Sequence, residues 1–215
     1  MGSRRTLSLL HAPLLLALGM AGCPGDTWLE RTQPIAPLAD GELRPPALLD
    51  RPDHCPGSTQ RVSDENLNVC VHRFPLPGWN EHPTLLHTHE EAEEACRLIG
   101  MRLCHENEWE LACRGRARSR YPYGDAYVSG RCVTGTAHPL PSGRRLDCRS
   151  DFGIHDTSGN VAEWTSEGLL KGGDATGGAF ESRCTARINP AIDEMPSFPG
   201  ARCCLDAHEP RGNDD

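Results

Sequence analysis

The cysteine content limits how this chain can fold. The 215 residues hold 11 cysteines, and the first of them, Cys23, ends a short apolar leader. Ten cysteines follow, an even number that could close five disulfides. Disulfides persist outside the cytoplasm, where thiols are oxidised, so the sequence predicts an exported, disulfide-rich chain. Spacing alone leaves the pairing open, because ten cysteines allow roughly a thousand connectivities.

Residues 1–22 have the pattern of a lipoprotein signal peptide. Arg4 and Arg5 precede an apolar run over residues 7–18, which is too short to span a bilayer. Small residues stand directly before Cys23, and acylation of Cys23 would anchor the mature chain without a transmembrane helix. An ordinary secreted chain with Cys23 unpaired is the alternative. We therefore expect a bacterial cell-envelope location through a lipid anchor, at the outer membrane if the host has two membranes, or secretion.

The charge of the mature chain restricts its partners. Removal of residues 1–22 leaves 193 of the 215 residues, enough for one domain with a hydrophobic core. Arg4 and Arg5 leave with the leader, so 20 basic residues face 30 acidic ones and the net charge is −10 with histidine neutral. This charge argues against nucleic acid and anionic membrane surfaces as partners. It is compatible with cation binding.

Composition divides the mature chain into three parts. Residues 23–54 hold six prolines and no periodic apolar pattern, which predicts an extended tether. A globular domain is expected over residues 55–205, followed by a polar tail over residues 206–215. Glycine and proline recur throughout the expected domain, which favours an α+β fold with little regular secondary structure.

The first of two predicted helices begins at a capping box. Thr88 supplies the hydroxyl, and Glu91 supplies the carboxylate three residues later. Ala92, Cys96 and Ile99 then fall on one helical face. The glycine that follows Ile99 predicts the end of this helix.

The second helix is predicted over residues 106–114. Its acidic first turn suits the helix dipole, and Trp109, Ala112 and Cys113 form its inner face. A glycine at position 115 predicts its end. His105 precedes the helix as a poor N-cap, and we assign it no catalytic role.

Sequence blocks between about residue 69 and residue 204 resemble a known family. The most specific is Gly-Asn-Val-Ala-Glu-Trp over residues 159–164. The other blocks, in order, cover residues 91–104, 106–115, 121–124, 152–158, 171–173, 183–187 and 200–203. Together they resemble the formylglycine-generating enzyme (sulfatase-modifying factor) family. The resemblance implies a single domain with the C-type-lectin-like α+β fold of that family.

A calcium site is one implication of the resemblance. Asp156, Gly159, Val161 and Glu163 place two carboxylates and two backbone carbonyls around a tight Gly-Asn turn. Calcium prefers about six to eight oxygen ligands and tolerates irregular loops. In the resembling family these four positions bind a structural Ca²⁺, so we expect Ca²⁺ to stabilise the fold without taking part in chemistry. The alternative is a turn in which Glu163 only accepts hydrogen bonds from nearby backbone N–H groups.

The resemblance also implies two disulfides, Cys96–Cys203 and Cys113–Cys184. Three more are expected from locality: Cys55–Cys70, Cys104–Cys204 and Cys132–Cys148. The adjacent Cys203 and Cys204 could instead form a redox or copper-binding pair. We favour the interpretation in which each of them bonds a different partner.

Catalytic members of the family bind copper(I) through a cysteine pair, because soft thiolates select this ion. The matching stretch here, residues 174–182, contains no cysteine. We therefore expect no copper centre in that place. Whether the chain is an enzyme stays uncertain, and the absence of these thiols favours a protein without catalytic activity.

Two functions from different classes follow. The first is a non-catalytic, calcium-stabilised binding or structural module, which recognises an envelope protein or a glycan among the loops near residues 174–182. The second is a metal-dependent oxidoreductase that acts on a cysteine or a related thiol substrate through other ligands. Fold alone does not decide between them.

Overall fold

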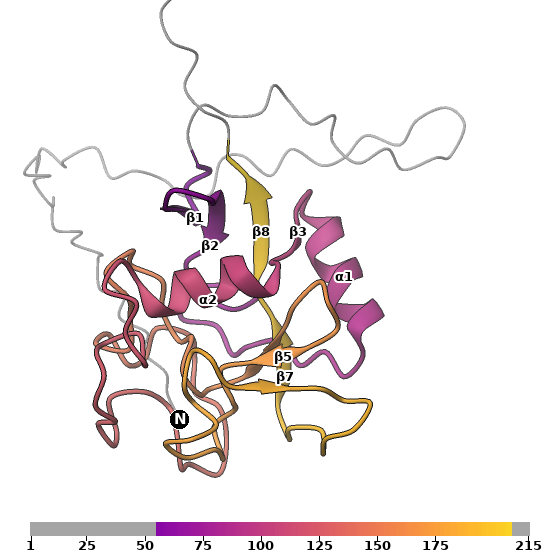
Figure 1. Cartoon of the computed structure of the whole chain (residues 1–215). Coiled ribbons are helices and arrows are strands. Elements are labelled where there is room, and N and C mark those ends of the chain that lie inside the picture. Colours follow the sequence, from indigo (N-terminus) through magenta and orange to yellow (C-terminus); the bar gives the residue numbers. More distant parts are fainter. Residues whose placement is uncertain (1–54, 208–215) are drawn as a thin grey trace, which may run out of the picture. The chain divides into compact units, whose positions relative to one another are not determined.

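Two four-stranded sheets form the framework of residues 55–207, the part of the chain that our computed structural model describes. Figure 1 shows these sheets with two helices beside them, which is the α+β fold that the sequence predicts. The predicted signal peptide over residues 1–22, the tether over residues 23–54 with its lipidation residue Cys23, and residues 208–215 of the tail lie outside the described residues.

The first sheet joins the beginning and the end of the described segment. Its strands are β1 (Thr59–Ser63), β2 (Asn68–His72), β8 (Cys203–Asp206) and β3 (Arg102–Leu103), in the spatial order β1-β2-β8-β3 with antiparallel neighbours. The last strand along the chain therefore lies inside the sheet, as Figure 1 shows. Strand β8 extends through Asp206, which pairs with Arg102, so regular structure continues one residue past the predicted domain end at residue 205.

The second sheet carries the most specific sequence block. Its strands are β4 (Ala162–Trp164), β5 (Leu170–Lys171), β6 (Arg187–Ile188) and β7 (Pro199–Ala201), in the order β6-β5-β4-β7. Strands β4 and β7 run parallel, and the other pairs are antiparallel. All three residues of β4 are buried, so the block serves the interior of the domain.

Helix α1 (His89–Leu98) begins as predicted. Thr88 accepts a hydrogen bond from the backbone N–H of Glu91, and the Glu91 carboxylate accepts one from the backbone N–H of Thr88. Ala92 and Cys96 are buried, as expected. The prediction that Ile99 shares this inner face is wrong, because the helix ends at Leu98 and Ile99 is 49% exposed.

Helix α2 (Glu106–Arg114) buries Trp109, Ala112 and Cys113 completely, as predicted. The backbone N–H of His105 donates to the Glu108 carboxylate at 2.8 Å, which forms half of a capping box. No helix within residues 55–207 is long and apolar enough to cross a bilayer.

Two clusters of buried side chains form the core. One surrounds Trp109 on α2 and contains Val62, Val69, Val71, Cys104, Trp109, Leu111, Ala112, Cys113, Phe152, Ile154, Cys184 and Cys204. The other lies between α1 and the second sheet and contains Leu76, Leu86, Ala92, Cys96, Leu103, Ala162, Trp164, Leu170, Ala201 and Cys203. Each helix therefore has its own cluster, and β8 contributes a cysteine to each.

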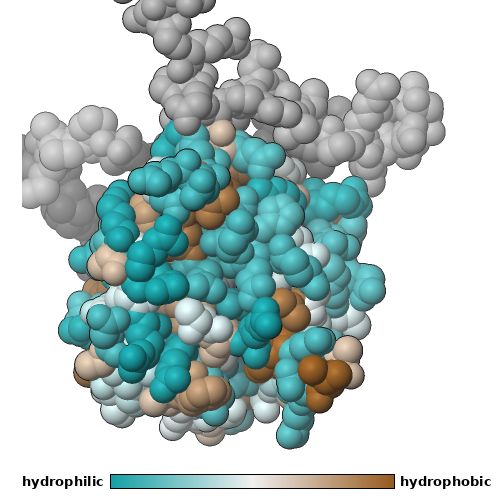
Figure 2. Space-filling view, viewed as in Figure 1, coloured by the Kyte–Doolittle hydropathy of each residue, from teal (hydrophilic) through white to brown (hydrophobic). Residues whose placement is uncertain are grey.

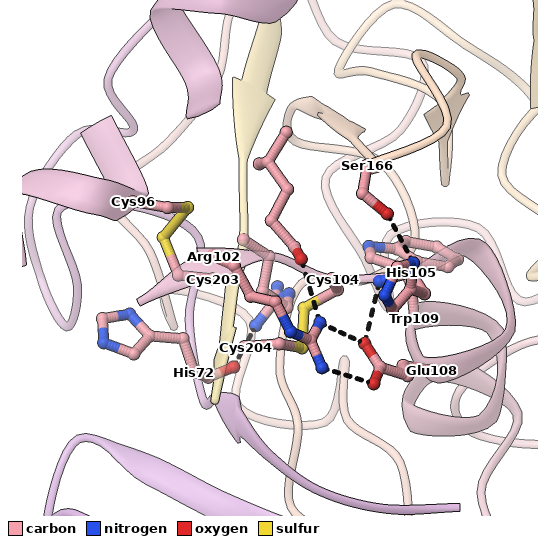
Figure 3. The surroundings of a disulfide bond; sticks show 12 residues. His72, Cys96, Arg102, Cys104, His105, Glu108, Trp109, Ser166, Cys203 and Cys204 are labelled. Carbon is pink, nitrogen blue, oxygen red and sulfur yellow. Dashed lines mark hydrogen bonds and ion pairs between the residues drawn. A yellow bond between two sulfur atoms is a disulfide. The ribbon is translucent and has the colours of Figure 1, made fainter. Parts of the chain in front are cut away.

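Five disulfides connect these elements. Their pairs are the ones expected above: Cys55–Cys70, Cys96–Cys203, Cys104–Cys204, Cys113–Cys184 and Cys132–Cys148. The adjacent Cys203 and Cys204 bond different partners, on α1 and after β3 respectively (Figure 3). Such a density of disulfides indicates a domain that folds outside the cytoplasm.

Candidate functional site

The Gly-Asn turn before β4 has a shape that its residues impose. Gly159 has φ +78, and a Cβ at this position would lie 2.2 Å from the carbonyl oxygen of Val133, so only glycine fits. Asn160 has φ +66, and its side-chain amide exchanges two hydrogen bonds with the backbone of Leu140. The turn therefore fixes the neighbouring loop and directs Glu163 into the core.

Glu163 lies in a buried network of side chains. Its Oε2 accepts hydrogen bonds from the indole N–H of Trp109 at 2.6 Å and from Nε of Arg202 at 2.7 Å. Its Oε1 accepts a third from Nη2 of Arg202, also at 2.7 Å. Both side chains of the ion pair are fully buried. The expected alternative to calcium, backbone N–H donors to Glu163, is therefore not what occupies this carboxylate.

Arg202 connects three parts of the domain. Besides Glu163 on β4, its guanidinium donates to the backbone carbonyls of His72 and His155, each at 2.7 Å. A buried ion pair stabilises a fold only when its hydrogen bonds are satisfied, and here the guanidinium meets four acceptors. The sequence blocks contained Arg202 but gave no sign of this role.

Asp156 is the second carboxylate of the predicted calcium site. It is 2% exposed, and its Oδ2 accepts a hydrogen bond from the backbone N–H of Gly143 at 2.6 Å. Burial is the largest influence on the pKa of the Asp156 carboxyl and raises it. The Gly143 hydrogen bond and Arg202 lower this pKa, the charge of Glu163 raises it, and the balance is a pKa of about 6. The charge of Glu163 therefore acts on the Asp156 carboxyl, as the smallest of these influences.

The calcium prediction depends on the surroundings of Asp156. A buried carboxyl destabilised by a neighbouring carboxylate is the environment that a bound Ca²⁺ would relieve. The hydroxyl oxygens of Ser142 and Thr157 are also buried and have no hydrogen-bond partner within the described residues. Glu163 contributes less than expected, because Arg202 already balances its charge. Asp156 is thus the residue on which the calcium prediction chiefly depends.

Residues 174–182, where the resemblance places the copper-binding thiols, form a loop held by its own hydrogen bonds. Asp174 Oδ1 accepts from the backbone and hydroxyl of Thr176, at 2.9 and 2.7 Å, and its Oδ2 accepts from the backbone of Phe198 at 3.1 Å. The Tyr121 hydroxyl donates to the carbonyl of Ala179 at 2.6 Å. The side chains of Asp174 and Thr176 and the carbonyl of Ala179 therefore already have hydrogen-bond partners within the protein.

A groove of about 390 Å³ lies beside this loop. Leu170 of β5, Phe180 of the loop and Ile188 of β6 supply its apolar lining, and Glu181, Arg187 and Asp193 supply charged groups. Phe180 is 66% exposed, with the guanidinium of Arg183 above its ring at 4.8 Å. Hydrophobic surface also lies over the loop between β6 and β7, where Ile192 is 82% exposed (Figure 2). We use the name β6 groove for the groove lined by Leu170, Phe180, Glu181, Arg187, Ile188 and Asp193.

A serine, a histidine and a glutamate meet near the start of α2, as Figure 3 shows in part. Ser166 Oγ lies 2.6 Å and Glu167 Oε1 lies 3.1 Å from Nδ1 of His105. Both contact the same ring nitrogen, whereas a catalytic triad uses the two nitrogens for different partners. Glu167 also accepts the backbone N–H of Glu106 at 2.9 Å, so this cluster holds the beginning of the helix.

Two histidines with shifted pKa values, the buried His72 and the partly buried His155, escaped the sequence analysis. Burial, chiefly, and the charge of Arg202 together lower the pKa of His72 to about 4. Burial, chiefly, and the charges of Arg202, Arg149 and Arg73 together lower the pKa of His155 to about 4. No periodic pattern marks these positions, so only the fold reveals their burial.

All ten cysteines within residues 55–207 form disulfides, so the structure holds none of them as a thiolate. Within the same range, no group of at least three His, Cys, Asp or Glu side chains is arranged so that it could hold a metal ion. Of the predicted site residues, Glu163 bonds to Arg202 and Trp109, and Asp156 bonds to the backbone of Gly143.

Comparison with known proteins extends these observations. The chain is 27% identical over 159 residues to inactive C-alpha-formylglycine-generating enzyme 2 of Bos taurus, covering 61% of this chain and 53% of that protein. It is 27% identical over 171 residues to the formylglycine-generating enzyme of Mus musculus, covering 59% and 45%. It is 36% identical over 105 residues to hercynine oxygenase of Mycolicibacterium smegmatis, covering 46% and 24%. The chain thus spans about half the length, or less, of these relatives.

The fold has a solved counterpart. PvdO from Pseudomonas aeruginosa superimposes with a TM-score of 0.50 at 14% sequence identity, covering 69% of this chain and 90% of that structure. The family sequence model for the sulfatase-modifying factor enzyme 1-like domain matches residues 57–207 of this chain. These residues are most of the chain and nearly all of the part that the structure describes. The chain therefore belongs to the sulfatase-modifying factor family, whose members include the formylglycine-generating enzymes.

Proposed function

We propose that this chain is a non-catalytic binding module of the bacterial cell envelope. The observation that carries the proposal is the loop over residues 174–182. It contains no cysteine where the resemblance places the copper-binding pair, and its polar groups are bonded within the protein. A relative that bears the word inactive in its name supports the same direction.

The β6 groove is the proposed binding surface, and its occupant is an extended segment of another envelope protein. Strand β6 lies at the edge of the second sheet, where an extended chain could add main-chain hydrogen bonds. Phe180, Ala186 and Ile188 offer apolar contacts for side chains of such a segment. The carboxylates of Glu181 and Asp193 favour a segment with a basic residue.

Site-specific photocrosslinking in the native host tests this surface. A photoreactive phenylalanine analogue replaces Phe180 in one variant and Leu146, which is 62% exposed and does not line the groove, in a control variant. We expect a protein adduct at position 180 and none at position 146. Equal adducts at both positions, or an adduct degraded by glycosidases and resistant to proteases, would contradict a protein segment as the occupant.

A copper(I) titration distinguishes the binding module from the alternative function, a metal-dependent oxidoreductase with a thiol substrate. The purified protein is alkylated and titrated against a colorimetric competitor, and dioxygen consumption is followed with a cysteine-containing peptide. We expect no stoichiometric copper site and no consumption above that of the peptide alone. A tight site accompanied by peptide oxidation would overturn the proposal.

The envelope location rests on the lipid anchor proposed at Cys23. A Cys23→Ala variant is expected to leave the membrane fraction and to lose incorporation of an alkyne-tagged fatty acid. Equal membrane retention of the variant and the natural chain would exclude this anchor.

We further propose that Ca²⁺ stabilises the domain by binding the Asp156 carboxylate and the backbone carbonyls of Gly159 and Val161. Glu163 would add a carboxylate oxygen that also accepts hydrogen bonds from its present partners. A chelator should lower the melting temperature of the natural protein, and excess Ca²⁺ should restore it. Asp156→Asn should abolish the difference, and it is a better test than a Glu163 variant, which would also leave Arg202 unpaired. A chelator effect of the same size in Asp156→Asn would contradict this site.

A further inference from the structure

A second groove, separate from the β6 groove, opens at the end of α2. Its volume is about 680 Å³, within the range of small-molecule sites. Three segments line it: the end of α2 with the residues after it, the turn over residues 122–125 and the loop over residues 149–153. The turn belongs to one of the family-like sequence blocks, but the proposed function uses none of these residues.

The charges in this groove are unevenly balanced. Arg114 pairs with Glu110 at 3.0 Å, and the Asp151 carboxylate accepts the backbone N–H of Arg116 at 2.9 Å. The Arg149 guanidinium, in contrast, has no hydrogen bond or ion pair with any side chain in residues 55–207. Asp125 accepts one backbone N–H, from Arg120 at 2.9 Å, and forms no ion pair with the rest of the described chain. One cation and one carboxylate are therefore left to a ligand.

A buried hydroxyl adds a second, independent sign of a ligand. Ser150 is 4% exposed and lines the groove, and its Oγ has no hydrogen-bond partner within the described residues. A buried polar atom without a partner costs free energy, so such atoms often mark a place for a missing group. Ser150 directly follows Arg149, so one loop supplies both residues to the groove lining.

We propose that this groove binds a free α-amino acid with an apolar side chain. Arg149 and Ser150 would hold the carboxylate, and Asp125 would hold the ammonium group. Ala117, Pro122 and Tyr123 supply apolar lining for the side chain. A phosphate dianion fits less well, because it would meet a single unpaired cation and the carboxylate of Asp125.

Three related probes test the charge requirement. L-Phenylalanine carries both charges, 3-phenylpropionate lacks the ammonium group, and phenethylamine lacks the carboxylate. Isothermal titration of the purified chain should give a Kd of about millimolar for L-phenylalanine. Each of the other two probes should bind at least about tenfold more weakly, because each loses a charge-assisted contact.

Matched variants connect the binding to the named residues. Arg149→Gln and Asp125→Asn should each weaken L-phenylalanine binding about tenfold. Arg144→Gln and Asp147→Asn remove exposed charges from the same region, outside the groove lining, and should leave the Kd unchanged. Equal binding of all three probes would overturn the proposal, as would equal losses in the groove and control variants. The β6-groove crosslink at Phe180 is unaffected by either result, so the two proposals fail separately.

Discussion

The Glu163–Arg202 network and the β6 groove differ in where they place charged and apolar side chains. In the network, two opposite charges are fully buried and every polar atom meets a partner. At the groove, Phe180 and the neighbouring Ile192 are largely exposed to solvent. Exposed apolar side chains beside a groove commonly mark interaction surfaces, whereas buried paired charges serve the fold. The difference separates the residues that keep the family fold from those that would give this chain its own partner.

The largest expected effect breaks the buried network. Arg202→Met should destabilise the domain by about 3–5 kcal/mol, because it leaves the Glu163 carboxylate buried without its counter-charge. Chemical denaturation measures the change. Arg187→Met, which removes the 65% exposed partner of Glu106, should cost less than about 1 kcal/mol. Equal losses in the two variants would show that burial of the network contributes nothing special.

The disulfides provide the next largest effect. Loss of Cys113–Cys184, whose cysteines are 71 residues apart, should destabilise by about 4 kcal/mol through the entropy of the unfolded chain. Loss of Cys132–Cys148, 16 residues apart, should cost about 3 kcal/mol on the same basis. Paired Cys→Ala variants and calorimetry under oxidising conditions measure both. A reversed order would indicate that packing around each bridge outweighs loop length.

His72 makes the interior sensitive to acid. Its pKa is about 4 in the folded domain, below the ordinary value of 6.5, so the unfolded chain binds the proton more readily. The contribution of His72 to stability is therefore complete above pH 6.5 and is lost as the pH falls from 6.5 towards 4. Between pH 6.5 and pH 4 the natural domain should lose about 1–3 kcal/mol of unfolding free energy through His72, and His72→Gln should abolish this loss. His82→Gln, at an exposed position, should retain the full acid sensitivity, as measured by denaturation at several pH values.

The smallest stability change is expected in the β6 groove. Phe180→Ala should alter the unfolding free energy by less than about 0.5 kcal/mol, because the ring is 66% exposed. The same variant should nevertheless lose the protein partner, measured by co-purification of the anchored chain from crosslinked cells. A large loss of stability would place Phe180 in the core instead of on a binding surface.

Patterns with short range in the sequence predicted the framework well. The Thr88 capping box and the inner face of α2 depend on residues within one or two turns, so the sequence alone locates them. The strands were harder to predict, because several contain only two or three residues and pair with segments far away in the chain. Ile99 shows the limit of periodicity, since the helix ended one residue before the pattern did.

The candidate site depended on contacts between distant residues. Glu163 and Arg202 are 39 residues apart, and the Trp109 indole reaches the same carboxylate from a separation of 54. No spacing rule connects such positions, so a sequence motif could suggest a calcium ligand but not the arginine that competes for it. The second groove is similar, because Asp125 and Arg149 share it only after the loops fold together.

The interior position of β8 has a consequence for biosynthesis. Strand β8, which completes the middle of the first sheet, is synthesised after every other strand of residues 55–207, and it supplies the second cysteine of two bridges. A nascent chain that has been translated only as far as residue 200 therefore cannot close this sheet. The first sheet and these two bridges can therefore form only after β8 itself has been made, and the strands made earlier lack their central partner until then.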